Sequence, residues 1–384
     1  MNITGKTKLL SNKADLPTGP IGRPGARLGN LPADYQRFGI NPGPTASWEH
    51  GMRTNGSPGS YEWWYFDTQL EDGTKIVLIF YTKFLTEING PLSPAISINI
   101  SRPDGTSEKA IHYFLAKDFF ASKHRCEIQI GKNTISEKSG KYFVHLELPE
   151  FSGEITYIST LPAWRPGTGH LLFGSSKSNN EDYFAWLVGA PKARVEAAVK
   201  SSGDIVVNKT GVGYHDHNWG NCSPLDLMNN WYWARAEVGS YTVIACRIIS
   251  EQKFSYEPIT LCMIAHNNKI IADGFETVKY SSSDVHVDPF TKKPVAHKLT
   301  FTVSGTENEK FIFQLIHEKD LFRDKLIDQA HGLQAFLGKL TGFDGAYIRF
   351  SGNSQLQRYH QEKLIDRQSA EAIWELMHFG HVKK

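Results

Sequence analysis

Segments of β-type sequence dominate the chain from Tyr61 onward and recur roughly every 8 to 15 residues, separated by turn signals such as Glu71-Asp72-Gly73. Alternation is clear in places, as where Val144, Leu146 and Leu148 occupy every second position with polar residues between them. We count about sixteen candidate strands. That number is too large for one small sandwich and suits two antiparallel barrels or sandwiches.

Length and charge narrow the class further. The chain has 384 residues, with 42 Lys+Arg against 40 Asp+Glu and a formal charge of +2. The length predicts two domains or one large β architecture. The near-neutral charge argues against nucleic acid or an anionic membrane as partner. Apolar runs such as 76–81 are far shorter than the roughly 20 residues of a membrane span. We therefore expect a soluble protein with no stable membrane insertion.

Several absences shape the expected chemistry. The first residues lack the apolar stretch of a secretory signal, so we expect a cytoplasmic protein. The four cysteines form no C-x-x-C pair, which argues against a zinc ribbon, a redox motif or a disulfide framework. There is also no Rossmann, Walker-type, G-x-S-x-G or H-E-x-x-H motif. The sequence therefore predicts a cavity chemistry without a cofactor or a metal.

Three segments depart from the β pattern. Residues 1–45 are rich in Gly and Pro and predict an irregular arm. Residues 320–340 carry apolar residues at helix-like spacing and predict a helical insertion. Near the C-terminus, Ala370, Ile373, Trp374 and Met377 stand at i, i+3, i+4 and i+7, with Gly380 at a C-cap position. This spacing predicts a docked amphipathic helix.

The first dense aromatic feature is the strand 61–67, Tyr-Glu-Trp-Trp-Tyr-Phe-Asp. Alternation sends Glu62, Trp64 and Phe66 to one face and the remaining residues to the other, so both faces are aromatic and both are covered. On residue type alone, core packing explains Trp63 and Phe66 best. Glu62 is different, because a buried carboxylate needs a partner or takes the raised pKa of a general acid.

The second feature is Gly-Tyr-His-Asp-His-Asn-Trp-Gly at 213–220, where His215, His217 and Trp219 share one face and Tyr214 and Asp216 the other. One interpretation is a polar network that pins the end of a barrel. Another is a proton source that faces a cavity. His-x-His also suits a metal, but no third ligand is identifiable nearby.

The third feature is Trp-Tyr-Trp-Ala-Arg-Ala-Glu-Val at 231–238. Its odd positions place Trp231 and Trp233 on one face with Arg235 and Glu237. Two indoles beside groups that can form an ion pair suit a cavity wall better than a dry core.

These features together resemble one family. The strand 62–67, the segment 213–220, the strand 231–233 and the terminal Trp-Glu-Leu-Met at 374–377 are similar to the hydroxyneurosporene synthase (carotenoid 1,2-hydratase) family. That superfamily also contains kievitone-hydratase-like proteins and fungal decalin-forming Diels–Alderases. The resemblance spans about residues 46–384. In the carotenoid hydratases, an aspartate of the Tyr-x-Asp part donates a proton, which implies this role for Asp216, with Tyr214 beside it.

The resemblance implies an all-β fold of two tandem lipocalin-like antiparallel β-barrel domains with a C-terminal helix. We accordingly expect an arm at 1–45, one barrel at 46–227, and a second at 228–384 that carries the helical insertion 320–340 and the C-terminal helix. The predicted catalytic residues are Asp216, Tyr214, His215 and Glu62. The predicted substrate-binding residues are Trp64, Tyr65, His217, Trp219, Trp231, Trp233 and Arg235.

The functional expectation is a cofactor-independent cyclase or isomerase that acts on a bulky hydrophobic polyene, polyketide or isoprenoid. Such an enzyme folds a flexible chain and either polarises it or starts its cyclisation with a proton. One alternative is a hydratase that adds water to an isoprenoid double bond. Another is a lipocalin-type carrier that binds a hydrophobic metabolite without changing it. A small hydrophobic ligand is the expected partner, and we expect a monomer or a homodimer.

Overall fold

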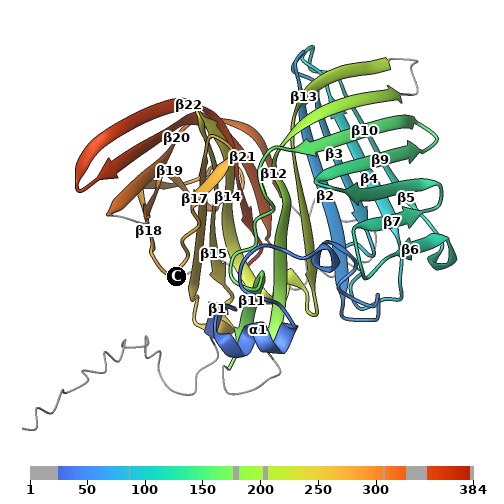
Figure 1. Ribbon diagram of the computed structural model, residues 1–384, viewed down its shortest axis with the longest axis horizontal. Coiled ribbons are helices and arrows are strands. Elements are labelled where there is room, and N and C mark those ends of the chain that lie inside the picture. The colour runs from blue at the N-terminus through green and yellow to red at the C-terminus, as the bar shows by residue number, and fades with distance from the viewer. Residues whose placement is uncertain are drawn as a thin grey trace, which may run out of the picture.

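Two antiparallel sheets stand side by side in the computed structural model, which describes residues 25–85, 87–175, 181–201, 206–305, 308–325 and 344–380 (Figure 1). Within these ranges the N-terminal sheet has 13 strands and the C-terminal sheet has 9. Each sheet curls around its own core, so the all-β, lipocalin-like architecture predicted from the sequence is confirmed. None of the described helices is both long and apolar enough to cross a bilayer.

The N-terminal sheet follows the order β5-β4-β3-β2-β13-β12-β10-β9-β8-β7-β6, with β11 pairing with β12 and β1 pairing with β11. Its strands are β1 (Gly25–Leu28), β2 (Tyr61–Leu70), β3 (Lys75–Tyr81), β4 (Ala95–Ser101), β5 (Ser107–Tyr113), β6 (Phe119–Ala121), β7 (Glu127–Ile130), β8 (Asn133–Lys138), β9 (Lys141–Glu147), β10 (Phe151–Ser159), β11 (His170–Gly174), β12 (Asp182–Ser201) and β13 (Val206–Gly220).

The C-terminal sheet follows the order β17-β16-β15-β14-β22-β21-β20-β19-β18. Its strands are β14 (Met228–Val238), β15 (Tyr241–Ser250), β16 (Pro258–His266), β17 (Lys269–Ala272), β18 (Val278–Val287), β19 (Pro294–Ser304), β20 (Glu309–Lys325), β21 (Ala346–His360) and β22 (Lys363–His378). The described helices are α1 (Pro32–Phe38), α2 (Pro224–Leu227) and the 3-10 turns Ser47–His50, Ala116–Asp118 and Gln252–Phe254.

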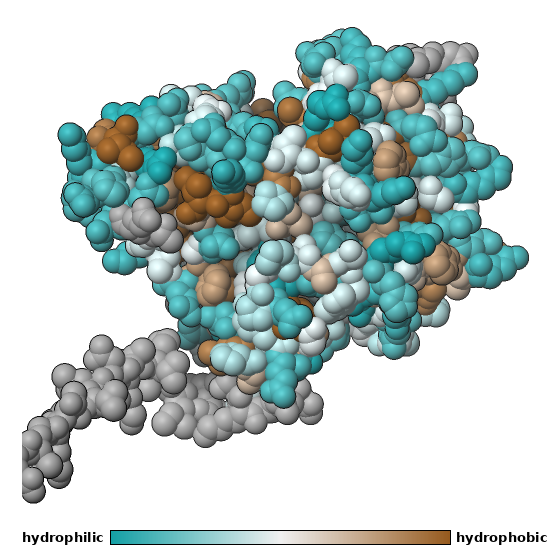
Figure 2. Space-filling model, viewed as in Figure 1, coloured by the Kyte–Doolittle hydropathy of each residue, from teal (hydrophilic) through white to brown (hydrophobic). Residues whose placement is uncertain are grey.

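The apolar residues divide among three main cores. One lies inside the curl of the N-terminal sheet and includes Val144 and Leu146, whose predicted alternation is confirmed. A second lies inside the C-terminal sheet and includes Phe313 and Trp374. The third lies between the two sheets, on the face of each that points away from its own curl. On the outer face drawn in Figure 2, hydrophilic residues predominate and the apolar ones form separate groups.

The predicted C-terminal helix is wrong, because residues 363–378 form strand β22. Trp374 and Leu376 point into the core of the C-terminal sheet, whereas Ile373 and Met377 point to the other face. A strand that is covered on both faces carries apolar residues at odd and even positions. Such a strand can match the helical spacing of i, i+3, i+4 and i+7 by coincidence.

The predicted helical insertion at 320–340 is also wrong at its start. Residues 320–325 belong to β20, which pairs with β21 across this stretch. Leu321 and Phe322 are exposed, so their apolar character did not mark a buried helix face. Residues 326–340 lie outside the described residues. The division into domains at 46–227 and 228–384 stays a prediction, with the strands of the two sheets on either side of it.

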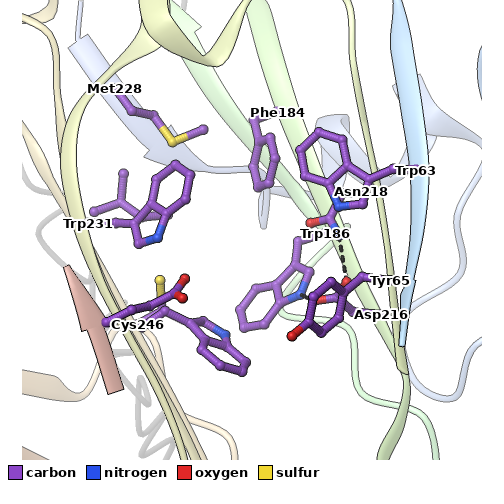
Figure 3. A pocket seen from close by; sticks show the side chains of 12 residues that line it. Trp63, Tyr65, Phe184, Trp186, Asp216, Asn218, Met228, Trp231 and Cys246 are labelled. Carbon is purple, nitrogen blue, oxygen red and sulfur yellow. Dashed lines mark hydrogen bonds between the residues drawn. The ribbon is translucent and has the colours of Figure 1, made fainter. Parts of the chain in front are cut away.

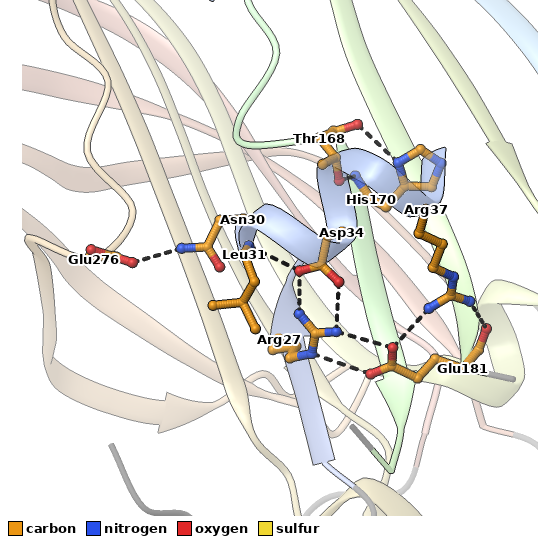
Figure 4. A network of polar contacts seen from close by, with 9 residues as sticks. All are labelled: Arg27, Asn30, Leu31, Asp34, Arg37, Thr168, His170, Glu181 and Glu276. Atoms are coloured by element: carbon orange, nitrogen blue, oxygen red, sulfur yellow. Dashed lines mark hydrogen bonds and ion pairs between the residues drawn. The ribbon is translucent and has the colours of Figure 1, made fainter. Parts of the chain in front are cut away.

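The segment predicted as an irregular arm contains β1 and α1 in its described part, which begins at residue 25. Arg27 donates to Asp34 at 2.6 Å and to Glu181 at 3.2 Å, which connects β1 with α1 and with the residue just before β12 (Figure 4). Asn30 donates to Glu276 at 2.6 Å, on the side of the C-terminal sheet. The N-terminal segment therefore contacts both sheets near one end of their interface.

Candidate functional site

The candidate site is a cavity of about 160 Å³ between the two sheets (Figure 3). Six residues of the N-terminal sheet form one wall: Trp63, Tyr65, Phe184, Trp186, Asp216 and Asn218. The opposite wall consists of Met228, Trp231, Trp233, Cys246, Ile248 and Glu375. The cavity is mostly apolar and aromatic, with two carboxyl groups on opposite walls.

Strand register explains the first wall. In the pairing of β2 with β13, Tyr65 lies opposite Asp216 and Trp63 lies opposite Asn218. In the pairing of β13 with β12, Asn218 lies opposite Trp186. Directly opposed residues point to the same face of a sheet. Three neighbouring strands therefore direct these aromatic and polar side chains into the cavity.

Asp216 accepts hydrogen bonds from three neutral donors. Its Oδ2 accepts from the Trp186 indole at 3.0 Å and from the Tyr214 hydroxyl at 2.8 Å. Its Oδ1 accepts from the Asn218 amide at 2.7 Å. This network holds the carboxyl group in one orientation at the cavity wall, and only 8% of the residue is exposed.

Burial dominates the ionisation of Asp216. It raises the pKa of the carboxyl to about 7, although the hydrogen bonds from Tyr214, Trp186 and Asn218 act in the opposite direction. The negative charge of Asp67 adds to the increase. Burial also raises the pKa of the Tyr214 phenol, which therefore stays a neutral donor. Asp216 consequently exchanges a proton near neutral pH, as a general acid must.

Strand register also explains the wall formed by the C-terminal sheet. Trp233 lies opposite both Cys246 on β15 and Glu375 on β22, and Glu375 lies opposite Arg349 on β21. These side chains share the face of the C-terminal sheet that meets the N-terminal sheet. Burial raises the pKa of the Cys246 thiol, so this cysteine is protonated and is a poor nucleophile at neutral pH.

Charged groups gather at one end of the cavity. Arg235 donates to Asp67 at 2.6 Å across the interface between the sheets, and its guanidinium lies 5.3 Å from the centre of the Tyr214 ring. Glu375 accepts from the Tyr347 hydroxyl at 2.8 Å. Burial raises the pKa of both the Asp67 and the Glu375 carboxyls, while neighbouring guanidinium groups oppose the increase.

The alternation predicted for β2 and β13 is confirmed, and it separates the predicted site residues into two groups. Tyr65, Asp216, Trp231 and Trp233 line the cavity. Tyr214 is not part of the lining but contacts Asp216 and Trp233, which are, and Arg235 lies over the Tyr214 ring. The remaining five lie on the opposite face of β2 and β13, which faces away from the cavity: Glu62, Trp64, His215, His217 and Trp219.

Glu62 has the partners that a buried carboxylate requires. It is fully buried and accepts from the Arg53 and Thr54 backbone amides at 2.7 and 2.9 Å and from His217 Nε2 at 2.6 Å. His215 bonds through Nδ1 to the Tyr65 carbonyl at 2.9 Å, and burial holds its pKa well below the usual range. These contacts tie β2, β13 and the segment before β2 together.

Sequence reasoning missed several cavity residues. Trp186 lies in the apolar run Phe-Ala-Trp-Leu-Val, which is typical of a strand in a hydrophobic core. Glu375 lies in the strand that the sequence predicted as a helix. Trp63 was predicted as core, but its ring faces the cavity (Figure 3). Asn218 was recognisable, since it shares the strand face of Asp216.

A family model described as Diels-Alderase-like matches residues 55–357, which is most of the chain. The chain belongs to the Diels-Alderase-like family. The resemblance stated from the sequence motifs is thereby confirmed.

Two curated relatives are similar to this Diels-Alderase-like chain over part of their length. The Diels-Alderase of Gibberella fujikuroi is 24% identical over 156 residues, which is 34% of this chain and 42% of the relative.

The second relative is the hydroxyneurosporene dehydrogenase of Chlorobaculum tepidum, 24% identical over 266 residues, or 59% of this chain and 66% of the relative. Both matches span less than two thirds of the relative. Among solved structures, the crystal structure of CghA has a TM-score of 0.56 and 15% identity, covering 94% of this chain and all of CghA (100%). This similarity establishes the fold.

Proposed function

We propose that this Diels-Alderase-like protein is a cofactor-independent cyclase or isomerase for a bulky hydrophobic polyene, polyketide or isoprenoid of secondary metabolism. In this proposal Asp216 is the acid of the reaction. One observation carries it: a buried carboxyl group with a pKa of about 7 lies in the wall of an aromatic cavity.

The pKa of Asp216 suits an acid at physiological pH. With a pKa of about 7, about half of the molecules carry the proton at neutral pH. With the ordinary value of 3.8, only about one in 1,600 would carry it. A neutral carboxyl can protonate an alkene, and it can also donate a hydrogen bond to the carbonyl that activates a diene or dienophile.

The aromatic wall suits the intermediates of such a reaction. Proton transfer from Asp216 to an alkene carbon leaves a carbocation, which an internal double bond attacks to close a ring. Loss of a proton from a neighbouring carbon then gives an isomer of the starting polyene. The faces of Trp63, Trp186 and Trp231 stabilise positive charge by cation–π interaction, and the apolar cavity excludes bulk water.

The size of the cavity defines what it holds. About 160 Å³ is enough for a group the size of benzene, whereas sites for whole drug-sized ligands measure roughly 300–1,000 Å³. The cavity therefore takes the reacting carbons, and the rest of a long substrate extends beyond it or displaces side chains. Burial of the reacting end next to Asp216 fixes one folded conformer.

A hydratase is the second candidate, because it uses the same acid and the cavity has a second carboxyl group that can activate water. A carrier needs the cavity but not the acid.

The test uses three linear probes in heavy water: geranylgeraniol, squalene and a conjugated tetraene fatty acid. Products are weighed by mass spectrometry, and binding of the fluorescent tetraene is measured separately.

Asp216→Asn is the decisive variant, and Asp226→Asn on the exposed side of α2 is its control. We expect Asp216→Asn to keep binding within a few-fold and to lower product formation at least a hundredfold. An isomer with deuterium on carbon indicates proton-initiated cyclisation, and an isomer without deuterium indicates cycloaddition. A product heavier by one water indicates the hydratase. Binding without any product in the wild type would favour the carrier.

A further inference from the structure

Glu375 faces the same cavity as Asp216 from the other sheet. It lies toward the C-terminal end of β22, between Trp233 on β14 and Arg349 on β21. Trp374 and Leu376, its neighbours in the chain, are almost fully buried, whereas Glu375 itself is only partly buried because it faces the cavity. Packing of the cavity wall alone would require only an apolar residue at this position, not a carboxyl group.

The contacts of Glu375 differ from those of Asp216. Asp216 is held by neutral donors, whereas Glu375 has a guanidinium opposite it in strand register. Its Oε2 accepts from the Tyr347 hydroxyl at 2.8 Å, and the Trp231 indole gives a further hydrogen bond. A carboxyl beside a guanidinium is held in its ionised form more strongly than one beside neutral donors.

The balance of charges at this end of the cavity also favours the ionised form of Glu375 over that of Asp216. Asp67 and Arg235 neutralise each other in their ion pair. Arg349 then balances one more negative charge, and Glu375 interacts with it electrostatically. Asp216 is the third carboxyl group and the only one of the three for which no guanidinium opposes the rise of its pKa among the described residues. Burial raises the pKa of both Asp216 and Glu375, but only Glu375 has a guanidinium that opposes the increase, so Glu375 is the better placed of the two to carry the negative charge.

We propose that Glu375 is the proton acceptor of the reaction, opposite the proton donor Asp216. This inference rests on the proposed function and assigns the group that accepts the proton in its second step. In cyclisation, Asp216 gives its proton to an alkene carbon, a carbon–carbon bond closes the ring, and Glu375 removes a proton from the carbon next to the resulting cation. The new double bond forms from that C–H electron pair, so the product is an isomer.

The balance in hydration is similar. Asp216 protonates the alkene, the oxygen of a water molecule attacks the cation, and Glu375 takes one proton from that water. After either reaction Asp216 is ionised and Glu375 is protonated. Exchange with solvent restores the starting state. The neighbouring Arg349 and Tyr347 remain in their charged and neutral forms throughout.

The first test compares Glu375→Gln with Asp216→Asn in heavy water, using the probe of the three that the wild type converts. Glu371→Gln, at an exposed position on the same strand, is the matched control. We expect Glu375→Gln to form product at least tenfold more slowly while deuterium still enters recovered substrate, because Asp216 delivers a deuteron and the cation then reverts to alkene by losing a protium to Asp216. Asp216→Asn loses both product and deuterium uptake.

Two outcomes would overturn the assignment. Unchanged product formation in Glu375→Gln shows that another group accepts the proton. Loss of deuterium uptake together with product shows that Glu375 acts before the cation or only structurally. Failure of the proposed function looks different: with the wild type, no probe gives product or takes up deuterium.

A binding test keeps the inference falsifiable without turnover. The probes are protonated N,N-dimethyldodecylamine, which mimics a cation on an alkyl chain, and neutral dodecanol. At about pH 6 we expect the wild type, Asp216→Asn and Glu371→Gln to prefer the ammonium probe. Glu375→Gln should lose about tenfold of that preference, since one favourable charge pair is removed. An unchanged preference in Glu375→Gln would contradict an ionised Glu375 in the cavity.

Discussion

Replacement of Asp216 by Asn has a predictable effect on stability as well as on turnover. Asn has nearly the same shape and never ionises. Its carbonyl can accept from Trp186 and Tyr214, and the amide of Asn218 can turn so that its oxygen accepts from the new NH₂ group. The variant therefore keeps the hydrogen bonds of the site and removes only the charge.

The magnitude follows from the pKa of the folded state. A carboxyl with a pKa of about 7 when folded and 3.8 when exposed holds its proton more tightly in the folded protein. Stability is then highest at low pH, falls as the pH rises from about 4 to about 7, and levels off above that. The total loss is about 4 kcal/mol, because three pKa units correspond to roughly that free energy.

The assay is urea denaturation of the wild type and of Asp216→Asn at several pH values, with Asp226→Asn as control. Between about pH 5.5 and 8, the free energy of unfolding of Asp216→Asn should rise by about 2 kcal/mol relative to the wild type. The control should show no such trend. A difference that is independent of pH, or one that grows as the pH falls, would refute a raised pKa for Asp216.

Three further predictions concern the groups around the cavity. Tyr214→Phe removes a donor to the Asp216 carboxylate, so the basic limb of the pH–activity profile should move up by about one unit; a downward shift would contradict this. Arg235→Gln leaves Asp67 buried without its guanidinium and should lower stability by about 3 kcal/mol in urea denaturation, with most of the loss restored by adding Asp67→Asn; no recovery in the double variant would show that the ion pair is not the cause. Glu62→Gln should lower stability by about 2 kcal/mol but leave the pH midpoint of activity unchanged, and a shifted midpoint would place Glu62 in the chemistry.

The sequence contained the local geometry of the site but not its location. Alternation placed Tyr214 and Asp216 on one face of β13 and His215 and His217 on the other, as the structure has them. Both faces of that strand are buried and both carry aromatic and titratable residues. Only the contact between the two sheets decides which face borders the cavity, and that contact joins residues more than 150 positions apart, such as Asp216 and Glu375. Glu62 looked catalytic because its partners, the amides of Arg53 and Thr54, are backbone groups with no sequence signature.

Glu375 was hidden for a related reason. Apolar residues on both faces of β22 imitate the spacing of a helix, and a predicted helix surface gives no reason to examine an isolated glutamate. Family resemblance made Asp216 a candidate, because its Tyr-x-Asp motif is local in sequence. It could not identify a partner on another sheet, where strand register rather than a motif sets the geometry.

The central claim is that Asp216 acts as an acid with a pKa of about 7 in the cavity between the sheets. The pH dependence of kcat/KM tests it most directly, because this ratio reports the ionisation of the free enzyme. With the probe that is converted, kcat/KM should fall about tenfold between pH 6 and pH 8, and Asp216→Asn should show no corresponding step. A profile that is flat across this range, or one that has already declined by about pH 5, would contradict the claim.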